Sequence, residues 1–236
     1  MKSLIIALAS FAVFNLATCQ YSSFPVSSSS DSARYLQYLR ERSQTERLRH
    51  EFESLCPGKD DELDNALYEL KKCSDQIDEN SETACSAMKN HFMRCSKPMS
   101  SLLESCVPEE SKGVPDLVFA SVHSAVNYLC KTDGEHIFEL ANHCVYKTNY
   151  KTMRCGRRMR TKLQQFKKKS PTKSDICEFA QSMKPCLKEH LDESCGNAIT
   201  KESFMGMFDA MMAPCSGVSK NQLETNYINE VEILDK

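Results

Sequence analysis

The chain has 236 residues, and its 30 basic and 32 acidic side chains give a formal net charge of −2. Because the charges nearly balance, attraction to a charged partner has to come from a local cluster and not from the whole chain. Its 13 cysteines are dense enough to exclude a reducing compartment and to indicate an oxidising, extracellular one.

Residues 1–19 have the features of a signal peptide. The run from Leu4 to Ala17 is almost wholly apolar, and at about 14 residues it is too short for a membrane helix of roughly 20. A retained anchor, or a lipid attached to Cys19, is the alternative. Cleavage after Cys19 leaves an even number of cysteines, whereas cleavage after Ala17 leaves an odd one. We therefore expect a secreted, extracellular protein without a transmembrane segment.

Two segments precede the cysteine-rich region. Residues 20–32 are rich in serine, cannot bury apolar surface and should be flexible. Residues 33–55 form a predicted charged amphipathic helix with few apolar positions. This helix either packs on the domain that follows or engages a partner.

The remaining twelve cysteines define a domain over residues 56–215. Structural zinc sites use cysteine pairs two to four residues apart, and these cysteines are never so close, so bound metal is not expected. They predict about six disulfides, whose pairing the sequence leaves open. The predicted disulfide cysteines are Cys56, Cys73, Cys85, Cys95, Cys106, Cys130, Cys144, Cys155, Cys177, Cys186, Cys195 and Cys215.

The first half of this domain has the spacing of three or four helices. Asp60 and Asp61 can cap a helix that reaches Cys73. Apolar residues and cysteines then recur in steps of three and four from 85 to 106, but Pro98 predicts two helices that meet at residue 97. Pro115 suits the first turn of a strongly apolar helix that ends at Cys130 and forms the buried centre.

The second half is also predicted to be helical. One helix opens at Asp133 or Gly134, carries Cys144 and Cys155 on one face and ends at Gly156. A short helix starts at residue 174, and Pro185 begins another that ends at residues 195–196. Residue 200 caps a last helix, which Pro214 stops. Strand patterns are missing, so the fold class is all-α, a disulfide-stapled bundle of short helices with a tail at 216–236.

The last cysteine block resembles a known family. Cys177, Cys186-Leu187 and Cys195-Gly196, followed by an amphipathic stretch and Cys215, are similar to the C-terminal signature of a nematode secreted twelve-cysteine domain family of unknown function (domain of unknown function nineteen, or T20D4-like domain). The resemblance implies a secreted helical domain without an established catalytic activity. It covers residues 56–215.

A basic block is the main candidate for binding. Residues 147–173 contain eleven Lys and Arg and no acidic residue. In a secreted protein such a block is typical of a site for sulfated polysaccharide or anionic lipid. The alternatives are a solvated loop neutralised by acidic surfaces at 60–64 or 75–82, and proteolytic processing. The candidate anion-binding residues are Lys151, Arg154, Arg157, Arg158, Arg160, Lys162, Lys167, Lys168 and Lys169.

No arrangement of residues predicts a reaction. The six histidines form no zinc-protease motif, and neither a nucleophile elbow nor a phosphate-binding glycine loop occurs. His123 and His143 are expected to be structural, and thiols committed to disulfides cannot act as nucleophiles. We therefore expect no catalytic residue, no cofactor and no metal. Nucleic acid is not expected as a partner, because no aromatic stacking platform accompanies the basic block.

The sequence thus predicts a non-enzymatic extracellular binding protein for a protein or polysaccharide partner, with an oligomeric state that it leaves open. A carrier of a small hydrophobic ligand inside the helix bundle is the alternative hypothesis. Its candidate lining residues are Met205, Met207, Phe208, Met211 and Met212, which serve equally well as core.

Overall fold

The computed structural model describes residues 46, 49–78, 80–147, 150–166 and 169–217. Every regular element in this part of the chain is a helix, so the predicted all-α, disulfide-stapled fold is confirmed. The predicted signal peptide, the serine-rich segment, most of the 33–55 helix and most of the C-terminal tail lie outside the described residues.

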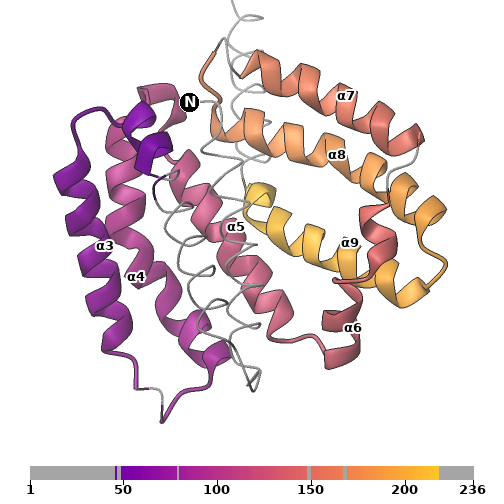
Figure 1. Ribbon diagram of the computed structural model, residues 1–236, viewed down its shortest axis with the longest axis horizontal. Helices are drawn as coiled ribbons and strands as arrows, with labels where there is room; N and C mark the ends of the chain where they lie inside the picture. The colour runs from indigo at the N-terminus through magenta and orange to yellow at the C-terminus, as the bar shows by residue number, and fades with distance from the viewer. Residues whose placement is uncertain (1–45, 47–48, 79, 148–149, 167–168, 218–236) are drawn as a thin grey trace, which may run out of the picture.

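Helices α3 (Asp60–Asp75) and α4 (Ala84–Cys106) lie side by side at one end of the molecule (Figure 1). Residues 49–55 are helical, and Phe52, only 4% exposed, packs with Leu63, Leu102 and Leu103 in one core. The described end of the predicted 33–55 helix therefore packs on the domain, and the core begins before the first disulfide cysteine. Lys59 occupies the N-cap of α3, and the two aspartates after it stand in its first turn, where they favour the helix dipole.

Helix α4 continues through Pro98, so the predicted break near residue 97 is wrong. A proline inside a helix removes a hydrogen bond and costs about 3 kcal/mol. Disulfides hold α4 on both sides of this proline, through Cys73–Cys95 to α3 and through Cys56–Cys106 to the turn before α3. Packing and these links outweigh the local preference for a break.

Helix α5 (Val114–Leu129) is the centre of the molecule, as its apolar sequence predicts (Figure 1). It contacts α4 on one side and α9 (Ala198–Met212) on the other. A short 3-10 turn, η1 (Glu109–Ser111), precedes it, and Gly113 at φ 79° forms its N-cap. Glycine is favoured here because this φ is left-handed, while a Cβ would meet only the end of the Lys173 side chain, which can move. Pro115 stands in the first turn, as expected.

The long helix predicted between Asp133 and Gly156 is wrong. The structure has α6 (Gly134–Glu139), the 3-10 turn η2 (His143–Tyr146) and α7 (Tyr150–Gln165) in its place. The Asn142 side chain accepts a hydrogen bond from the Cys144 backbone N–H at 3.1 Å and so caps η2, which ends the preceding helix. Cys144 and Cys155 consequently lie on different elements, and Gly156 lies inside α7.

Helix α8 (Lys173–Ser194) is continuous through Pro185, so the two helices predicted here are one. A capping box of Thr172 and Asp175 starts it. The last helix, α9, is capped by Asn197 and not by Thr200, whose side chain is fully buried. The 3-10 turn η3 (Ala213–Cys215) follows, with Pro214 at the predicted stop.

The described disulfides divide the domain into two halves. Three lie in the N-terminal half (residues 49–130), namely Cys56–Cys106, Cys73–Cys95 and Cys85–Cys130. Two lie in the C-terminal half (residues 133–217), namely Cys144–Cys195 and Cys177–Cys215. Cys186 is disulfide-bonded as well, and the Cys155 side chain lies outside the described set.

Non-covalent contacts join the two halves in the described structure. The Tyr128 hydroxyl on α5 donates to the Ser203 carbonyl on α9 at 3.2 Å. The buried Ser111 hydroxyl donates to the Pro171 carbonyl at 2.8 Å. Leu117 packs with the Cys177–Cys215 disulfide. The junction is therefore a packed surface centred on α5.

Candidate anion-binding face

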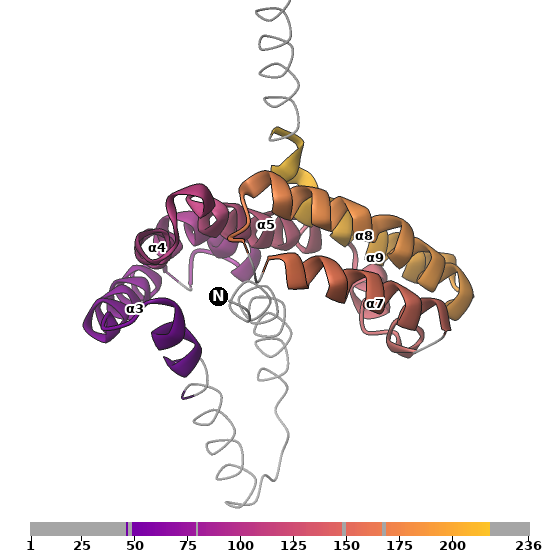
Figure 2. The same ribbon diagram turned by 90° about the horizontal axis from the view of Figure 1, so that it is seen from above.

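Helix α7 carries most of the basic block and packs along α8 (Figure 2). Its inner side contains Met159, Leu163 and, just beyond its end, Phe166, all half-buried. The Phe166 ring meets Phe179 of α8 edge-on at 5.6 Å. These contacts fix which side of α7 faces outward.

The outward side of α7 presents arginines beside a methionine. Met153, Arg157 and Arg160 follow an i, i+4, i+7 spacing, which places them on one face of the helix. All three are exposed, Met153 at 52%. Thr161 and Gln164 complete this side and are exposed too. We call Met153, Arg157 and Arg160 the α7 face.

The structure brings part of the predicted anion-binding set together. Besides Arg157 and Arg160, Lys162 is exposed on α7, and Lys169 is exposed between α7 and α8. The backbones of the other three predicted α7 residues are helical, but their side chains lie outside the described set: Lys151, Arg154 and Arg158. Lys167 and Lys168 lie outside the described residues altogether.

The exposed arginines of α7 form no ion pair with any described residue. Two aspartates of the neighbouring helices are paired with lysines between α8 and α9, through Lys184–Asp209 at 2.6 Å and Lys201–Asp192 at 3.2 Å. At the N-terminus of α8, the Thr172 backbone N–H holds the pKa of Asp175 below its usual value, with a smaller contribution from Lys169. The α7 face thus keeps its positive charge toward solvent.

The acidic surfaces that could have neutralised the block lie in the other half. The first, at residues 60–64, lies on α3, where Asp64 pairs with Arg49. In the second, at residues 75–82, Asp75 pairs with Lys71 at 2.6 Å, and Glu82 meets His91 at 2.7 Å. Hydrogen bonds from His91 and Ser86 hold the pKa of Glu82 low. These acids have partners within their own half.

Two exposed aromatic side chains on the elements that precede α7 were missed by the sequence analysis. Phe138 on α6 is 79% exposed, and Tyr146 at the end of η2 is 67% exposed. The six-residue helix α6 is too short to bury both of its sides, since it makes fewer than two turns. The sequence analysis gave Phe138 no role, because the helix expected there directed Ile137, Ala141 and Cys144 toward the core.

Four of the described histidines, His91, His123, His136 and His190, have side-chain partners, while His143, expected to be structural, is exposed. His190, 7% exposed, donates from Nε2 to the Val145 carbonyl at 2.7 Å. His123 donates from Nε2 to the Lys89 carbonyl at 3.0 Å and stacks on Phe92. The Asp133 carboxylate raises the pKa of His136. Within the described residues, no group of three or more His, Cys, Asp or Glu has an arrangement that could hold a metal ion.

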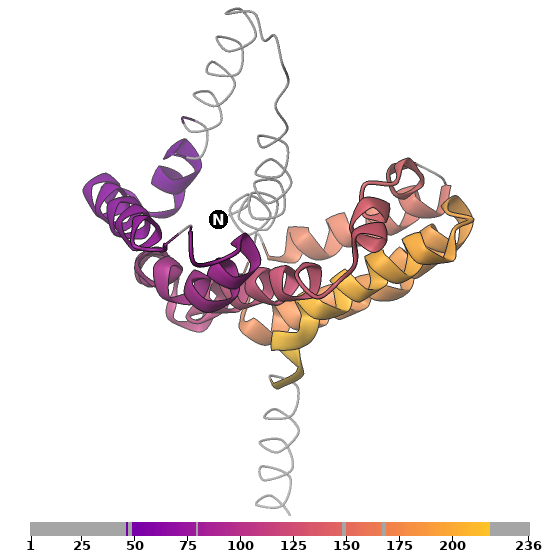
Figure 3. The same cartoon turned by 90° about the horizontal axis from the view of Figure 1, so that it is seen from below.

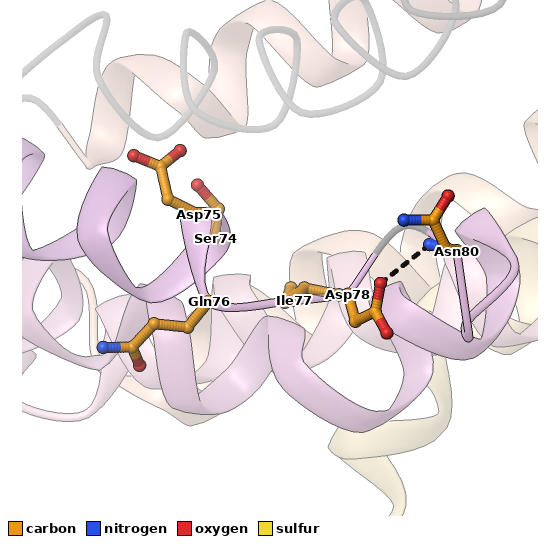
Figure 4. A pocket seen from close by; sticks show the side chains of 6 residues that line it. All are labelled: Ser74, Asp75, Gln76, Ile77, Asp78 and Asn80. Atoms are coloured by element: carbon orange, nitrogen blue, oxygen red, sulfur yellow. Dashed lines mark hydrogen bonds between the residues drawn. The ribbon is translucent and has the colours of Figure 1, made fainter.

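The residues of the carrier hypothesis lie on α9 and at its end and are half-buried. Met212 packs with Leu117 and the Cys177–Cys215 disulfide, so it belongs to the core. A depression of about 610 Å³ lies elsewhere, at the end of α3 (Figure 4), and is lined mainly by polar side chains. Asp78 accepts a hydrogen bond from the Asn80 backbone N–H at 3.0 Å there, which lowers the pKa of Asp78. These contacts stabilise a turn and add no chemistry.

None of the helices described is both long and apolar enough to cross a bilayer. The fold and its surface define a class, an all-helical disulfide-stapled domain with one basic helix. Within that class, the chain belongs to the DUF1397 family, a family of proteins of unknown function, whose model matches residues 39–216. No curated protein and no solved structure matches the chain.

The expected membership in a family of unknown function is confirmed, while the resemblance to the nematode domain stays a prediction. The family match starts at residue 39, inside the predicted 33–55 helix. Part of that segment therefore belongs to the family domain, in agreement with the packing of Phe52 in the core.

Proposed function

We propose that this protein is a secreted, non-enzymatic binding protein that attaches to an anionic surface outside the cell, such as a sulfated polysaccharide, through α7. The observation that carries the proposal is the outward side of this helix, where Arg157 and Arg160 are exposed without an ion pair to any described residue, while Lys162 is exposed on another side of the same helix. Arginine forks bind sulfate oxygens in pairs and attract a polyanion without needing a deep pocket.

Three features support secretion. Eleven cysteines of the described chain are disulfide-bonded, which is typical of an oxidising compartment. The Cys177 to Cys215 spacing resembles that of a secreted nematode domain, and the N-terminus has the pattern of a cleaved signal peptide. A secreted protein meets polyanions on cell surfaces and in the extracellular matrix.

Heparin chromatography tests the proposal. The disulfide-bonded protein should be retained at physiological salt, and the double variant Arg157→Glu/Arg160→Glu should elute at clearly lower salt, because screened attraction depends on the exposed charges. Lys131→Glu/Lys188→Glu is the matched control. It makes the same change in net charge at exposed sites outside the basic block.

The control should elute close to the parent protein, apart from the small effect of net charge. Equal elution of the parent and of the α7 double variant would contradict the proposal. So would failure of the parent protein to be retained. Circular dichroism should show the same helix content in all three proteins, because every changed side chain is exposed.

A further inference from the structure

The basic helix and the two elements before it expose apolar and aromatic side chains that polysaccharide binding does not require. Exposed large hydrophobic side chains of the C-terminal half are Phe138, Tyr146 and Met153. They lie on α6, on η2 and on α7, three consecutive elements of the chain. Met153 stands one helical turn before Arg157 on the same side of α7, so apolar and cationic groups share one surface.

The three elements project from the same side of one layer. Helix α6 packs on α9, η2 packs on α8, and α7 packs on α8. Figures 2 and 3 show α7 and the α6–η2 segment on one side of the layer that α8 and α9 form. Lys147, exposed directly after Tyr146, adds a further cation between η2 and α7.

We propose that Phe138, Tyr146 and Met153, together with Lys147 and the arginines of the α7 face, form a docking surface for a membrane that contains anionic phospholipid. This inference rests on the proposed function and names lipid as the anionic surface. Lys and Arg attract the lipid phosphates and carboxylates, while aromatic side chains settle at the level of the headgroups. A sulfated polysaccharide offers no apolar layer to Phe138, which a lipid surface does.

The charge pattern supports lipid over a protein partner. Membrane attachment in the interface needs an apolar group for insertion and basic residues around it, and both are present within this short part of the chain. Each basic residue near an anionic leaflet contributes a modest attraction, and the apolar side chains prevent release when salt screens it. The surface needs no pocket, and it uses only side chains that are already exposed.

Vesicle co-sedimentation tests the inference. The disulfide-bonded protein should bind vesicles of phosphatidylcholine with phosphatidylserine and should not bind vesicles of phosphatidylcholine alone. Phe138→Ala/Tyr146→Ala should weaken binding to the anionic vesicles by at least about tenfold, because two inserting aromatic groups are lost. Its elution from heparin should match that of the parent.

Leu67→Ala/Tyr68→Ala is the control variant. It removes two exposed apolar side chains from α3, at 43% and 64% exposure, and should leave vesicle binding unchanged. Equal loss in this control, or unchanged vesicle binding by the Phe138→Ala/Tyr146→Ala variant, would overturn the inference. Retention on heparin without binding to anionic vesicles would overturn it as well and leave the proposed function in place. Failure of the parent protein to bind either heparin or the anionic vesicles would contradict both proposals.

Discussion

The two halves of the domain are stabilised in different ways. Twelve side chains of Phe, Leu, Val, Ala or Cys are buried in the N-terminal half, with Phe52, Leu102 and Leu103 in one cluster. In the described C-terminal half, Leu191 is the only fully buried leucine, valine, isoleucine, phenylalanine or methionine. Cysteines, Pro171 and polar groups such as His190 and Thr200 occupy the other buried positions. The half with the smaller apolar core carries the basic and aromatic surface.

This difference indicates that the two halves differ in what stabilises them and in what they expose to a partner. A half that buries little apolar surface gains less from the hydrophobic effect and depends more on its covalent links. Its exposed groups, in turn, are free to contact a partner. The C-terminal half should therefore be the more sensitive of the two to loss of a disulfide.

Removal of a disulfide should destabilise the C-terminal half more than the N-terminal half. Cys177→Ala/Cys215→Ala opens a link across 38 residues, and the chain-entropy model gives a loss of about 4 kcal/mol in the free energy of unfolding. Amide hydrogen exchange should rise throughout α8 and α9, because few buried apolar side chains remain to hold them.

Cys73→Ala/Cys95→Ala is the counterpart in the N-terminal half, with a separation of 22 residues. Exchange in α3 and α4 should rise less, since the Leu102–Leu103 cluster remains. Equal exchange increases in the two variants would show that the halves do not differ in this respect.

A single methyl group added at the junction between the halves should destabilise the protein. In Gly206→Ala, the new Cβ would lie 2.5 Å from the Tyr128 hydroxyl oxygen and 2.8 Å from the ring carbon that bears it, so the ring has to move. Overpacking of this kind costs about 1–3 kcal/mol, more than the gain in helix propensity offsets. Urea unfolding measures the loss.

Gly156→Ala is the matched control inside α7. Its Cβ would meet no atom within 4 Å, so only the gain in helix propensity applies. We expect this variant to be more stable than the parent by about 0.5–1 kcal/mol. A gain of stability in both variants would mean that α5 and α9 are not closely packed at Tyr128.

Acid should reduce the contribution that one hydrogen-bonded carboxylate in each half makes to folding stability. The Ser100 hydroxyl, followed by Lys97, holds the pKa of Asp116 below its ordinary 3.8. A lowered pKa in the folded state stabilises the protein above the pKa of the unfolded chain, and this contribution is lost as the pH falls through the folded pKa. Ser100→Ala should cost about 0.5–1 kcal/mol at neutral pH, because Asp116 is partly exposed, and the cost should shrink below pH 3.8.

Thr200→Val tests the same effect in the C-terminal half. The Thr200 hydroxyl, followed by the Asn142 amide, lowers the pKa of Glu139 from its ordinary 4.5. Stability from this carboxylate is likewise present at neutral pH and lost in acid. Unfolding curves at pH 7 and at pH 3 measure both variants. A loss of stability that is the same at both pH values would show that the variant acts through packing and not through the carboxylate.

Much of the fold follows from the sequence, because helices need only local spacing. Cysteines at helical intervals, the apolar run of α5 and the missing strand patterns predict an all-α disulfide-bonded domain. The errors lie where distant contacts outweigh local preference. Pro98 and Pro185 predict helix ends, but cysteines on both sides of each proline are disulfide-bonded, and the helices continue.

The candidate site was only partly predictable. A run of basic residues shows its charge directly, so the α7 arginines were found. Phe138 and Tyr146 were not found, because their exposure follows from the end of α6 at Glu139 and the cap of η2 by Asn142. The cap of η2 by the Asn142 side chain is a local hydrogen bond that accompanies this change from one helix to two short elements. Sequence spacing cannot distinguish these outcomes.

Amide hydrogen exchange of the full disulfide-bonded protein, measured with and without a heparin oligosaccharide, tests whether the protein binds polyanions through α7. Binding through α7 predicts slower exchange in residues 150–165, with α3 and α4 unchanged, because only the C-terminal half presents the basic face. Slower exchange centred on α3 and α4, or no change anywhere at saturating oligosaccharide, would contradict the claim.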